Sequence, residues 1–124
     1  FDIEKLNQLA HILELTKEEK NLAKDAKNYM DRMYSRDIRI QDVAGILHVH
    51  PNYLSTLFRR EYDQSPREYL RKVRMNQAKL LLATTEYSIS DISSDVGYTN
   101  PFQFSKVFKS CYGISPTEYR NMRQ

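Results

Sequence analysis

The sequence predicts an all-α fold of about seven helices, in which two similar modules are joined by one long central helix. Three observations predict this fold. Glycine and proline are scarce, at 3 and 4 of 124 residues, and no long Val/Ile/Thr run suggests a sheet. Apolar residues recur at helical spacing along the chain. The prolines form two pairs, at 51 and 101 and at 66 and 116, and the members of each pair are 50 residues apart (101 − 51 and 116 − 66).

A repeated unit of roughly 30 residues accounts for this spacing. At the offset of 50 residues the segment Ser65–Tyr69 matches Ser115–Tyr119. Ahead of the first proline the register slips by one residue, so that Asp42 matches Asp91. Two copies are too few for a solenoid, and we therefore expect two like modules on one scaffold.

Prolines and capping residues mark where the helices begin. Proline suits the first helical position, where its missing N–H would have no partner, and a Ser or Thr three residues ahead of Glu or Asp indicates a capping box. The boxes are Thr16 with Glu19, Ser65 with Glu68, Ser88 with Asp91 and Ser115 with Glu118, while Asn100 is a further cap and His50 a poorer one. The expected helices span residues 17–36, 40–47, 51–62, 66–84, 89–96, 101–112 and 116–122.

Each module contains the parts of a helix-turn-helix, which needs two short helices, a tight turn and a small residue where the helices cross. Ala44 and Ser93 are the small residues at the matched crossing positions. Gly97 in the second turn can take a positive φ, and His48 in the first turn tolerates that region better than most side chains. Both modules are therefore predicted to be helix-turn-helix units.

These boundaries divide the chain into four segments. The first helix-turn-helix subdomain is expected over residues 17–66, the connecting helix over 67–84 and the second subdomain over 85–124. Residues 1–16 also show helical spacing, and they form either a short N-terminal helical extension or a linker from an upstream region. Because the chain begins with Phe1 rather than Met, we expect it to be a fragment of a longer protein.

Charge is distributed unevenly along the chain, whose net charge is +3. Residues 1–37 hold 7 Lys/Arg and 8 Asp/Glu, a net of −1, whereas residues 38–124 hold 12 and 8, a net of +4. Basic clusters of this kind suit a polyanion such as nucleic acid. From charge alone, a set of solvated helix faces explains the clusters equally well.

Several spaced motifs carry a family resemblance. They are Asp42-Val43-Ala44, Tyr53-Leu54-Ser55 and Leu57-Phe58-Arg59-Arg60, then Arg74-Met75 with Ala78 and Leu81-Leu82, and lastly Val96-Gly97-Tyr98, Phe104–Lys109, Tyr112-Gly113 and Ser115–Tyr119. Together they resemble the DNA-binding domain of AraC/XylS-type bacterial transcription regulators, over about residues 18–122. Membership implies seven helices, two recognition helices joined by a long central helix, and transcription control, usually activation. It also implies RNA polymerase as a partner and a separate sensor domain through which any dimer would form. The central helix expected over 66–84 would be about 28 Å long at ~1.5 Å of rise per residue, and we therefore expect the recognition helices to enter successive major grooves of double-stranded DNA.

Two positions in the first module depart from the family pattern. Arg39 stands where the family often has a Ser or Thr cap, as Ser88 does in the second module. Asp63 stands where the family prefers glycine to end the recognition helix, as Gly113 does. Because Asp adopts the left-handed conformation at some cost, both departures are expected to weaken the local order of the first unit.

The residues expected to touch DNA follow from the outward faces of the two recognition helices and from the matching family positions. The expected base contacts are Asn52, Ser55 and Thr56 in the first unit and Phe102, Gln103 and Lys106 in the second, and the expected phosphate contacts are Arg59, Arg60, Arg67 and Lys109. Alternatives remain at several positions. Asn52 and Asn100 could serve only to cap or solvate their helices, and Phe102 could pack in the core. Any single Arg among the expected phosphate contacts could equally be solvated or ion-paired. Arg74 falls among the apolar residues that recur at helical spacing in the long helix, and this position favours a structural salt bridge over DNA contact.

Other classes of function find little support in the sequence. His48 and His50 have no nearby Cys or carboxylate partners at metal-ligand spacing, and Cys111 is most simply a small buried residue. We predict no catalytic residue, metal or cofactor, hence no enzyme, and a cytoplasmic location without a membrane span. An architectural or RNA-binding domain and a protein-interaction bundle are the other binding modules considered. An architectural or RNA-binding domain would need exposed wedge residues or stacking aromatic side chains. A protein-interaction bundle would leave the repeated polar helix starts unexplained.

Overall fold

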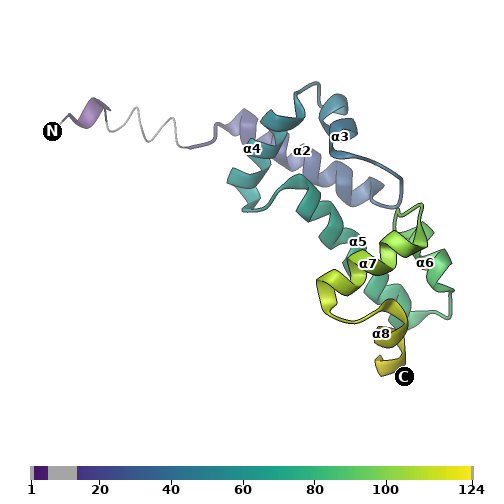
Figure 1. Ribbon diagram of the computed structural model, residues 1–124. Helices are drawn as coiled ribbons and strands as arrows, with labels where there is room; N and C mark the ends of the chain where they lie inside the picture. Colours follow the sequence, from purple (N-terminus) through teal and green to yellow (C-terminus); the bar gives the residue numbers. More distant parts are fainter. Residues whose placement is uncertain (1, 6–13, 124) are drawn as a thin grey trace.

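The structure is a computed structural model that describes residues 2–5 and 14–123 (Figure 1). In this described part no strand occurs, and residues 3–5 are helical. Seven further helices follow: α2 (Lys17–Met33), α3 (Ile40–Ile46), α4 (Pro51–Tyr62), α5 (Pro66–Thr84), α6 (Ile89–Asp95), α7 (Pro101–Tyr112) and α8 (Pro116–Arg123). The all-α prediction is thereby confirmed. Most of the segment 1–16, for which a helical extension or a linker was expected, lies outside the described residues.

The helix starts lie where prolines and caps predict them. The four prolines each occupy the first position of α4, α5, α7 or α8. Thr16 forms a complete capping box with Glu19, and Ser115 forms one with Glu118. Ser65 and Ser88 supply only half of the predicted boxes, because their hydroxyls accept from the backbone of Glu68 and Asp91 without a hydrogen bond in return.

Helix ends were predicted less well than helix starts. α2 ends at Met33 rather than at residue 36, and α3 and α6 each end one residue earlier than expected. After α2 the chain turns at once, since Arg36 N–H donates to the Met33 carbonyl at 3.0 Å and Ile38 N–H donates to the Arg36 carbonyl at 2.8 Å. No Gly or Pro marks this point in the sequence, which is why the helical pattern overran the true end.

Four of the described residues take a positive φ, and they lie at matched places in the two units. The turns contain His48 (φ 59°) and Gly97 (φ 98°), and the recognition helices end at Asp63 (φ 57°) and Gly113 (φ 80°). The left-handed conformation predicted for His48, Gly97 and Asp63 is thus confirmed. Position 39 also proves better capped than expected, because the Asp42 carboxylate accepts a hydrogen bond from Arg39 N–H at 2.9 Å.

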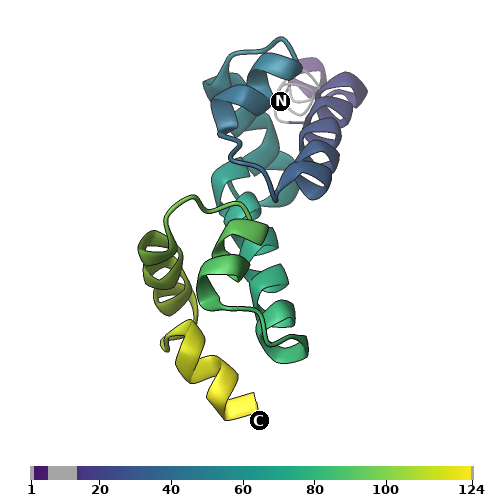
Figure 2. The same cartoon turned by 90° about the vertical axis from the view of Figure 1, so that its right-hand side faces the viewer.

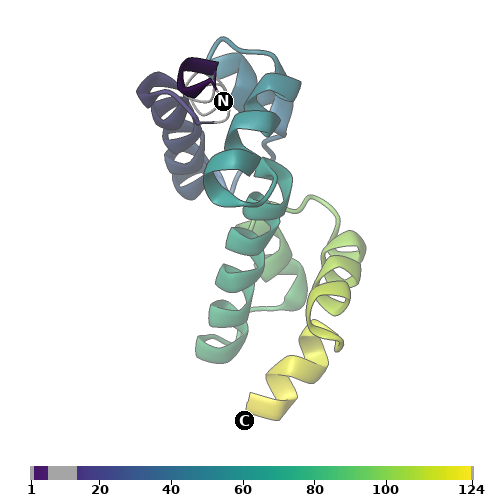
Figure 3. The same ribbon diagram turned by 90° about the vertical axis from the view of Figure 1, so that its left-hand side faces the viewer.

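Two separate apolar clusters hold the molecule together, and α5 contributes to both. Figures 2 and 3 show the path of this helix from one half of the molecule to the other. The first cluster consists of Ala23, Ala26, Met30, Val43, Ala44, Leu54, Phe58 and Leu70. The second consists of Met75, Ala78, Leu82, Ile92, Val96, Phe104 and Phe108. On α5, Leu70 is the last residue of the first cluster and Met75 the first of the second, so the two cores meet at the middle of this helix. The helices α2 to α4 gather around one end of α5 and α6 to α8 around the other (Figure 1).

Arg74 lies at the point where the two cores meet, and it is structural, though not through a salt bridge. Its guanidinium donates to the backbone carbonyls of Tyr34 at 3.0 Å and Arg36 at 2.9 Å. Among the described residues the one ion pair within 4.0 Å joins Lys27 to Asp31. The expected carboxylate partner of Arg74 is therefore replaced by two carbonyl oxygens.

Candidate nucleic-acid interface

The first recognition helix, α4, turns its apolar side inward and leaves a polar side in solvent. Leu54, Leu57 and Phe58 are buried, with 1% or less of each exposed. The opposite side carries Asn52 and Thr56, which are exposed, and Ser55, which is half-buried. This arrangement follows from helical periodicity, which returns side chains to one face every three to four residues.

The hydrogen bonds around α4 leave its first turn able to read bases. The cap of α4 is the Nδ1 atom of His50, which accepts from Asn52 N–H at 3.1 Å, so the amide side chain of Asn52 is not the cap. The Thr56 hydroxyl donates to the Asn52 carbonyl at 3.0 Å, which leaves its oxygen lone pairs and its methyl group toward solvent. Asn suits the N6 and N7 atoms of adenine, and a Thr methyl suits that of thymine.

The second recognition helix, α7, also turns an apolar side inward and a second side toward solvent, but its solvent-facing residues differ from those of α4. Phe104 and Phe108 are fully buried, whereas Gln103 and Lys106 are exposed. Phe102 is 85% exposed, so the alternative that it packs in the core is wrong. Asn100 serves as the cap, because its side-chain oxygen accepts from the backbone N–H groups of Phe102 at 2.9 Å and Gln103 at 3.4 Å.

The four expected phosphate-contacting side chains are all exposed. Arg59 and Arg60 lie in the last turn of α4, Arg67 in the first turn of α5, and Lys109 in the last turn of α7. None of the four is in the ion pair that the structure shows within the described ranges. Arg60 also helps lower the pKa of Glu19, although the main cause of that shift is the hydrogen bond from the Thr16 backbone. Cations at these positions are free to meet a polyanion.

Other basic residues have structural partners instead. Arg120 donates to the carbonyls of Tyr87 at 2.7 Å, Leu82 at 3.2 Å and Thr85 at 3.3 Å, and so binds one carbonyl in the last turn of α5 and two beyond the end of that helix. The Lys79 ammonium lies 4.7 Å from the centre of the Tyr112 ring. Counting charge along the sequence overstates the basic surface, because it cannot separate these cations from the exposed ones.

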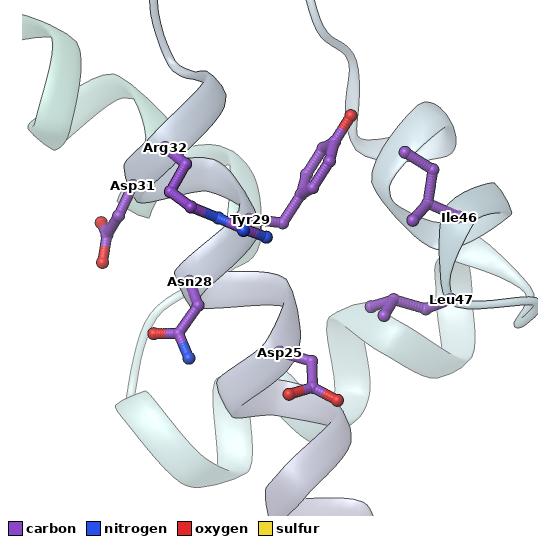
Figure 4. Close-up of a pocket in the computed structure, with 7 residues that line it drawn as sticks. All are labelled: Asp25, Asn28, Tyr29, Asp31, Arg32, Ile46 and Leu47. Carbon is purple, nitrogen blue, oxygen red and sulfur yellow. The ribbon is translucent and has the colours of Figure 1, made fainter.

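Two features away from the outward faces of the recognition helices are the thiol of Cys111 and a groove on the first unit. Cys111 is exposed, which contradicts the prediction that it is buried. A groove of about 560 Å³ runs between α2 and α3 (Figure 4). Asp25, Asn28 and Arg32 project from α2, and Ile46 and Leu47 face them from α3 and its cap. None of the expected DNA-contacting residues lines this groove.

The described part of the chain has neither a metal-binding cluster nor a membrane-spanning helix. No three His, Cys, Asp or Glu side chains gather there into a group that could hold a metal ion. None of the described helices is both long and apolar enough to cross a bilayer.

Comparisons with known proteins find similarity to helix-turn-helix transcription regulators. The family pattern described as a helix-turn-helix domain matches residues 43–122. The lactose operon transcription activator of Staphylococcus xylosus is 40% identical over 96 residues, which are 77% of this chain and 34% of that protein. The chain spans about a third to two fifths of the length of four of the curated relatives it matches, and 14% of the length of another.

Solved structures agree with these relatives. The C-terminal domain of AraT, a response regulator from Geobacillus stearothermophilus, superposes with a TM-score of 0.80 at 36% identity and covers 83% of this chain and 86% of its own. The DNA-binding domain of AdpA, a global transcriptional factor solved in complex with a target DNA, superposes with a TM-score of 0.76 over 81% of this chain and 90% of its own. At 21% identity the second likeness concerns the fold alone.

Proposed function

Because the chain belongs to the AraC-type family of helix-turn-helix DNA-binding domains of transcription regulators, we propose that α4 and α7 read one double-stranded DNA site together. The observation that carries this proposal is the pairing of two exposed, base-compatible helix starts. Asn52 and Thr56 stand at the start of α4, and Gln103 and Lys106 stand at the start of α7. Each set projects from a helix whose opposite side is fixed in a core.

The length of α5 sets the expected geometry of the site. Its 19 residues correspond to about 28 Å at ~1.5 Å of rise per residue. This length is comparable to the ~34 Å helical repeat of B-DNA. The two recognition helices would therefore enter successive major grooves on one face of the duplex, with Asn52, Ser55, Thr56, Phe102, Gln103 and Lys106 on the bases and Arg59, Arg60, Arg67 and Lys109 on the phosphates.

The role of the whole protein is the second part of the proposal. The Staphylococcus xylosus relative is an activator of an operon, which supports a role in transcription activation rather than an enzymatic role. Such a protein would act in the cytoplasm and contact RNA polymerase. The subdomains are proposed at 17–66 and 85–124, joined by 67–84. A sensor domain outside this chain would supply the signal and any dimer contact.

Selection of bound DNA followed by gel-shift measurements on spaced sites tests the proposal. A single chain is expected to protect one asymmetric site with two short boxes about one helical turn apart. Inserting about 5 bp between the boxes should abolish most of the specific affinity, and inserting about 10 bp should not restore it, because α5 cannot stretch by a further turn.

Salt and competitor arms make the same experiment decisive. Log affinity should fall linearly with log salt, by about 0.9 per phosphate contacted. A slope near zero on duplex DNA, or equal competition by RNA, would contradict DNA binding. Unchanged affinity across the spacing series would show that only one helix reads DNA.

A further inference from the structure

We propose that Arg74 is the positioning residue that fixes the second reading unit against the first, so that both recognition helices fit one DNA site at once. The inference rests on the proposed function of two-helix reading. It concerns the middle of α5, where the first apolar core ends and the second begins. Leu70 ends the first cluster on this helix, Met75 begins the second, and Arg71 and Lys72 between them are exposed.

Arg74 contacts both units from this position. Toward the first unit, Nε donates to the Tyr34 carbonyl at 3.0 Å and an Nη2 N–H donates to the Arg36 carbonyl at 2.9 Å. Tyr34 is the C-cap of α2, so its carbonyl lies at the negative end of the helix and lacks an intrahelical partner. Toward the second unit, the guanidinium lies 5.3 Å from the centre of the Tyr98 ring, within the range of cation–π attraction.

The burial of Arg74 shows that this contact is closed to water. Only 9% of the residue is exposed, and burial lowers the pKa of its guanidinium, opposed by the nearby Tyr98 and Asp37. A buried cation is retained where several polar partners compensate its lost hydration. The guanidinium fork is suited to this task because it donates to two carbonyls in one plane and stacks on a ring at the same time.

Gly97 shows that the two units also meet backbone to backbone. A Cβ atom at this position would lie 2.3 Å from the Tyr34 carbonyl oxygen and 2.9 Å from Arg74 Nε. The turn of the second helix-turn-helix therefore rests on the end of α2, as the adjacent loops in Figure 1 indicate. The same turn is also bound to the second unit. Tyr98 N–H donates to the Ser93 carbonyl at 2.9 Å, and the centres of the Tyr98 and Phe104 rings lie 5.7 Å apart.

These contacts form a second connection between the units, in addition to the covalent path through α5. One helix alone leaves bending and twisting between its two ends, whereas two connections at different places restrict both motions. The relative orientation of α4 and α7 is what turns two weak half-site contacts into one tight binding event, because the second contact is made at a high effective concentration. Arg74 therefore acts on affinity for the complete site without touching DNA.

A distance measurement on the free protein tests the restriction directly. Cys111 is exposed on α7 and is the only cysteine of the sequence, so it and an added cysteine at the exposed position Asn28 on α2 can carry two spin labels. We expect one narrow distance distribution in this labelled protein. The Arg74→Met change, which keeps a long apolar stem without donors, should broaden the distribution. Lys72→Met, which removes an exposed cation from the same helix, is the matched control and should leave the distribution narrow.

A DNA measurement on the same variants tests the consequence. On a selected two-box site and on sites with one box scrambled, Arg74→Met should lower the ratio of full-site to half-site affinity by about tenfold and leave half-site affinity nearly unchanged. Lys72→Met should leave that ratio unchanged. If Arg74→Met fails to fold, Arg74→Lys takes its place, because lysine keeps the charge and lacks the planar fork.

An unchanged distance distribution in the folded Arg74 variant would overturn the inference, as would equal losses on full and half sites. The first readout needs no DNA. If the domain proved not to bind DNA, the proposed function would fail, and the distance distribution would still show whether Arg74 holds the two units together.

Discussion

The two helix-turn-helix units share one chain path, yet they solve the same backbone problem with different residues. The first unit places His48 and Asp63 at its two left-handed positions, and the second places Gly97 and Gly113 at the matched ones. A Cβ at Gly113 would meet no atom within 4 Å, whereas a Cβ at Gly97 would collide with the Tyr34 carbonyl. Gly97 is therefore required because a neighbouring carbonyl leaves no room for a Cβ atom. At Gly113 glycine is favoured only by its positive φ.

The largest expected effect comes from filling the contact between the units. Gly97→Ala combines an unfavourable φ with a clash against backbone, and we expect it to lower the free energy of unfolding by about 3 kcal/mol or more in urea titrations. Gly113→Ala, with the same φ sign and open space, should cost about 1 kcal/mol. Gly45→Ala in α3, where a Cβ meets nothing within 4 Å, should stabilise by about 0.5 kcal/mol. Equal losses at 97 and 113 would show that φ alone matters.

The next effect separates the two reading surfaces. Asn52→Ala and Thr56→Ala should relax base preference in one half of the selected site, and Gln103→Ala and Lys106→Ala in the other half. Each change should cost about 1–3 kcal/mol of binding free energy on the preferred sequence, measured by gel shift. Asn28→Ala on the exposed side of α2 is the control and should leave binding unchanged. If all four changes altered the same base pairs, the two units would not be independent readers.

A smaller effect is expected where the recognition helices end. Asp63→Gly should stabilise the protein by about 1 kcal/mol, because glycine adopts the left-handed conformation freely and the change removes a negative charge from the C-terminus of α4. Gly113→Asp should destabilise it by a similar amount. Thermal or urea unfolding measures both. A loss of stability in Asp63→Gly would mean that the Asp63 side chain has a stabilising role of its own.

The smallest effect concerns the caps of the same helices. His50→Asn should stabilise α4 by a few tenths of a kcal/mol, since asparagine is among the preferred N-caps and histidine is not. Asn100→His should weaken α7 by a comparable amount, and Asn100→Ala by about 1 kcal/mol. Urea titrations of the three variants check this order. No difference between His50→Asn and the parent would show that the imidazole cap is as good as an amide cap.

The sequence predicted what local chemistry determines. Prolines and caps mark the helix starts, and periodicity separates the buried Leu54 and Phe58 from the exposed Asn52 and Thr56. The failures involve distant neighbours. The end of α2 depends on carbonyl contacts made by Arg74, a residue 38 to 40 positions away.

Two side chains show the same limit at the surface. Cys111 was expected to be buried, but Tyr112 and Tyr119 pack on Phe108, and the thiol is left outside. The exposure of Phe102 depends on how α7 lies on its core, which its own sequence does not reveal. Whether the exposed residues touch DNA stays a prediction, because the complementary surface belongs to another molecule.

Sharing α5 between two cores has a consequence for how the protein folds and how it can be divided. Leu70 completes one core and Met75, Ala78 and Leu82 supply the other. Loss of structure in either unit removes packing from a helix that the other unit needs, so we expect one cooperative unfolding transition rather than two. A proteolytic cut within α5 would leave two fragments with incomplete cores. The two repeats are thus similar in sequence pattern, but we do not expect either one to fold on its own.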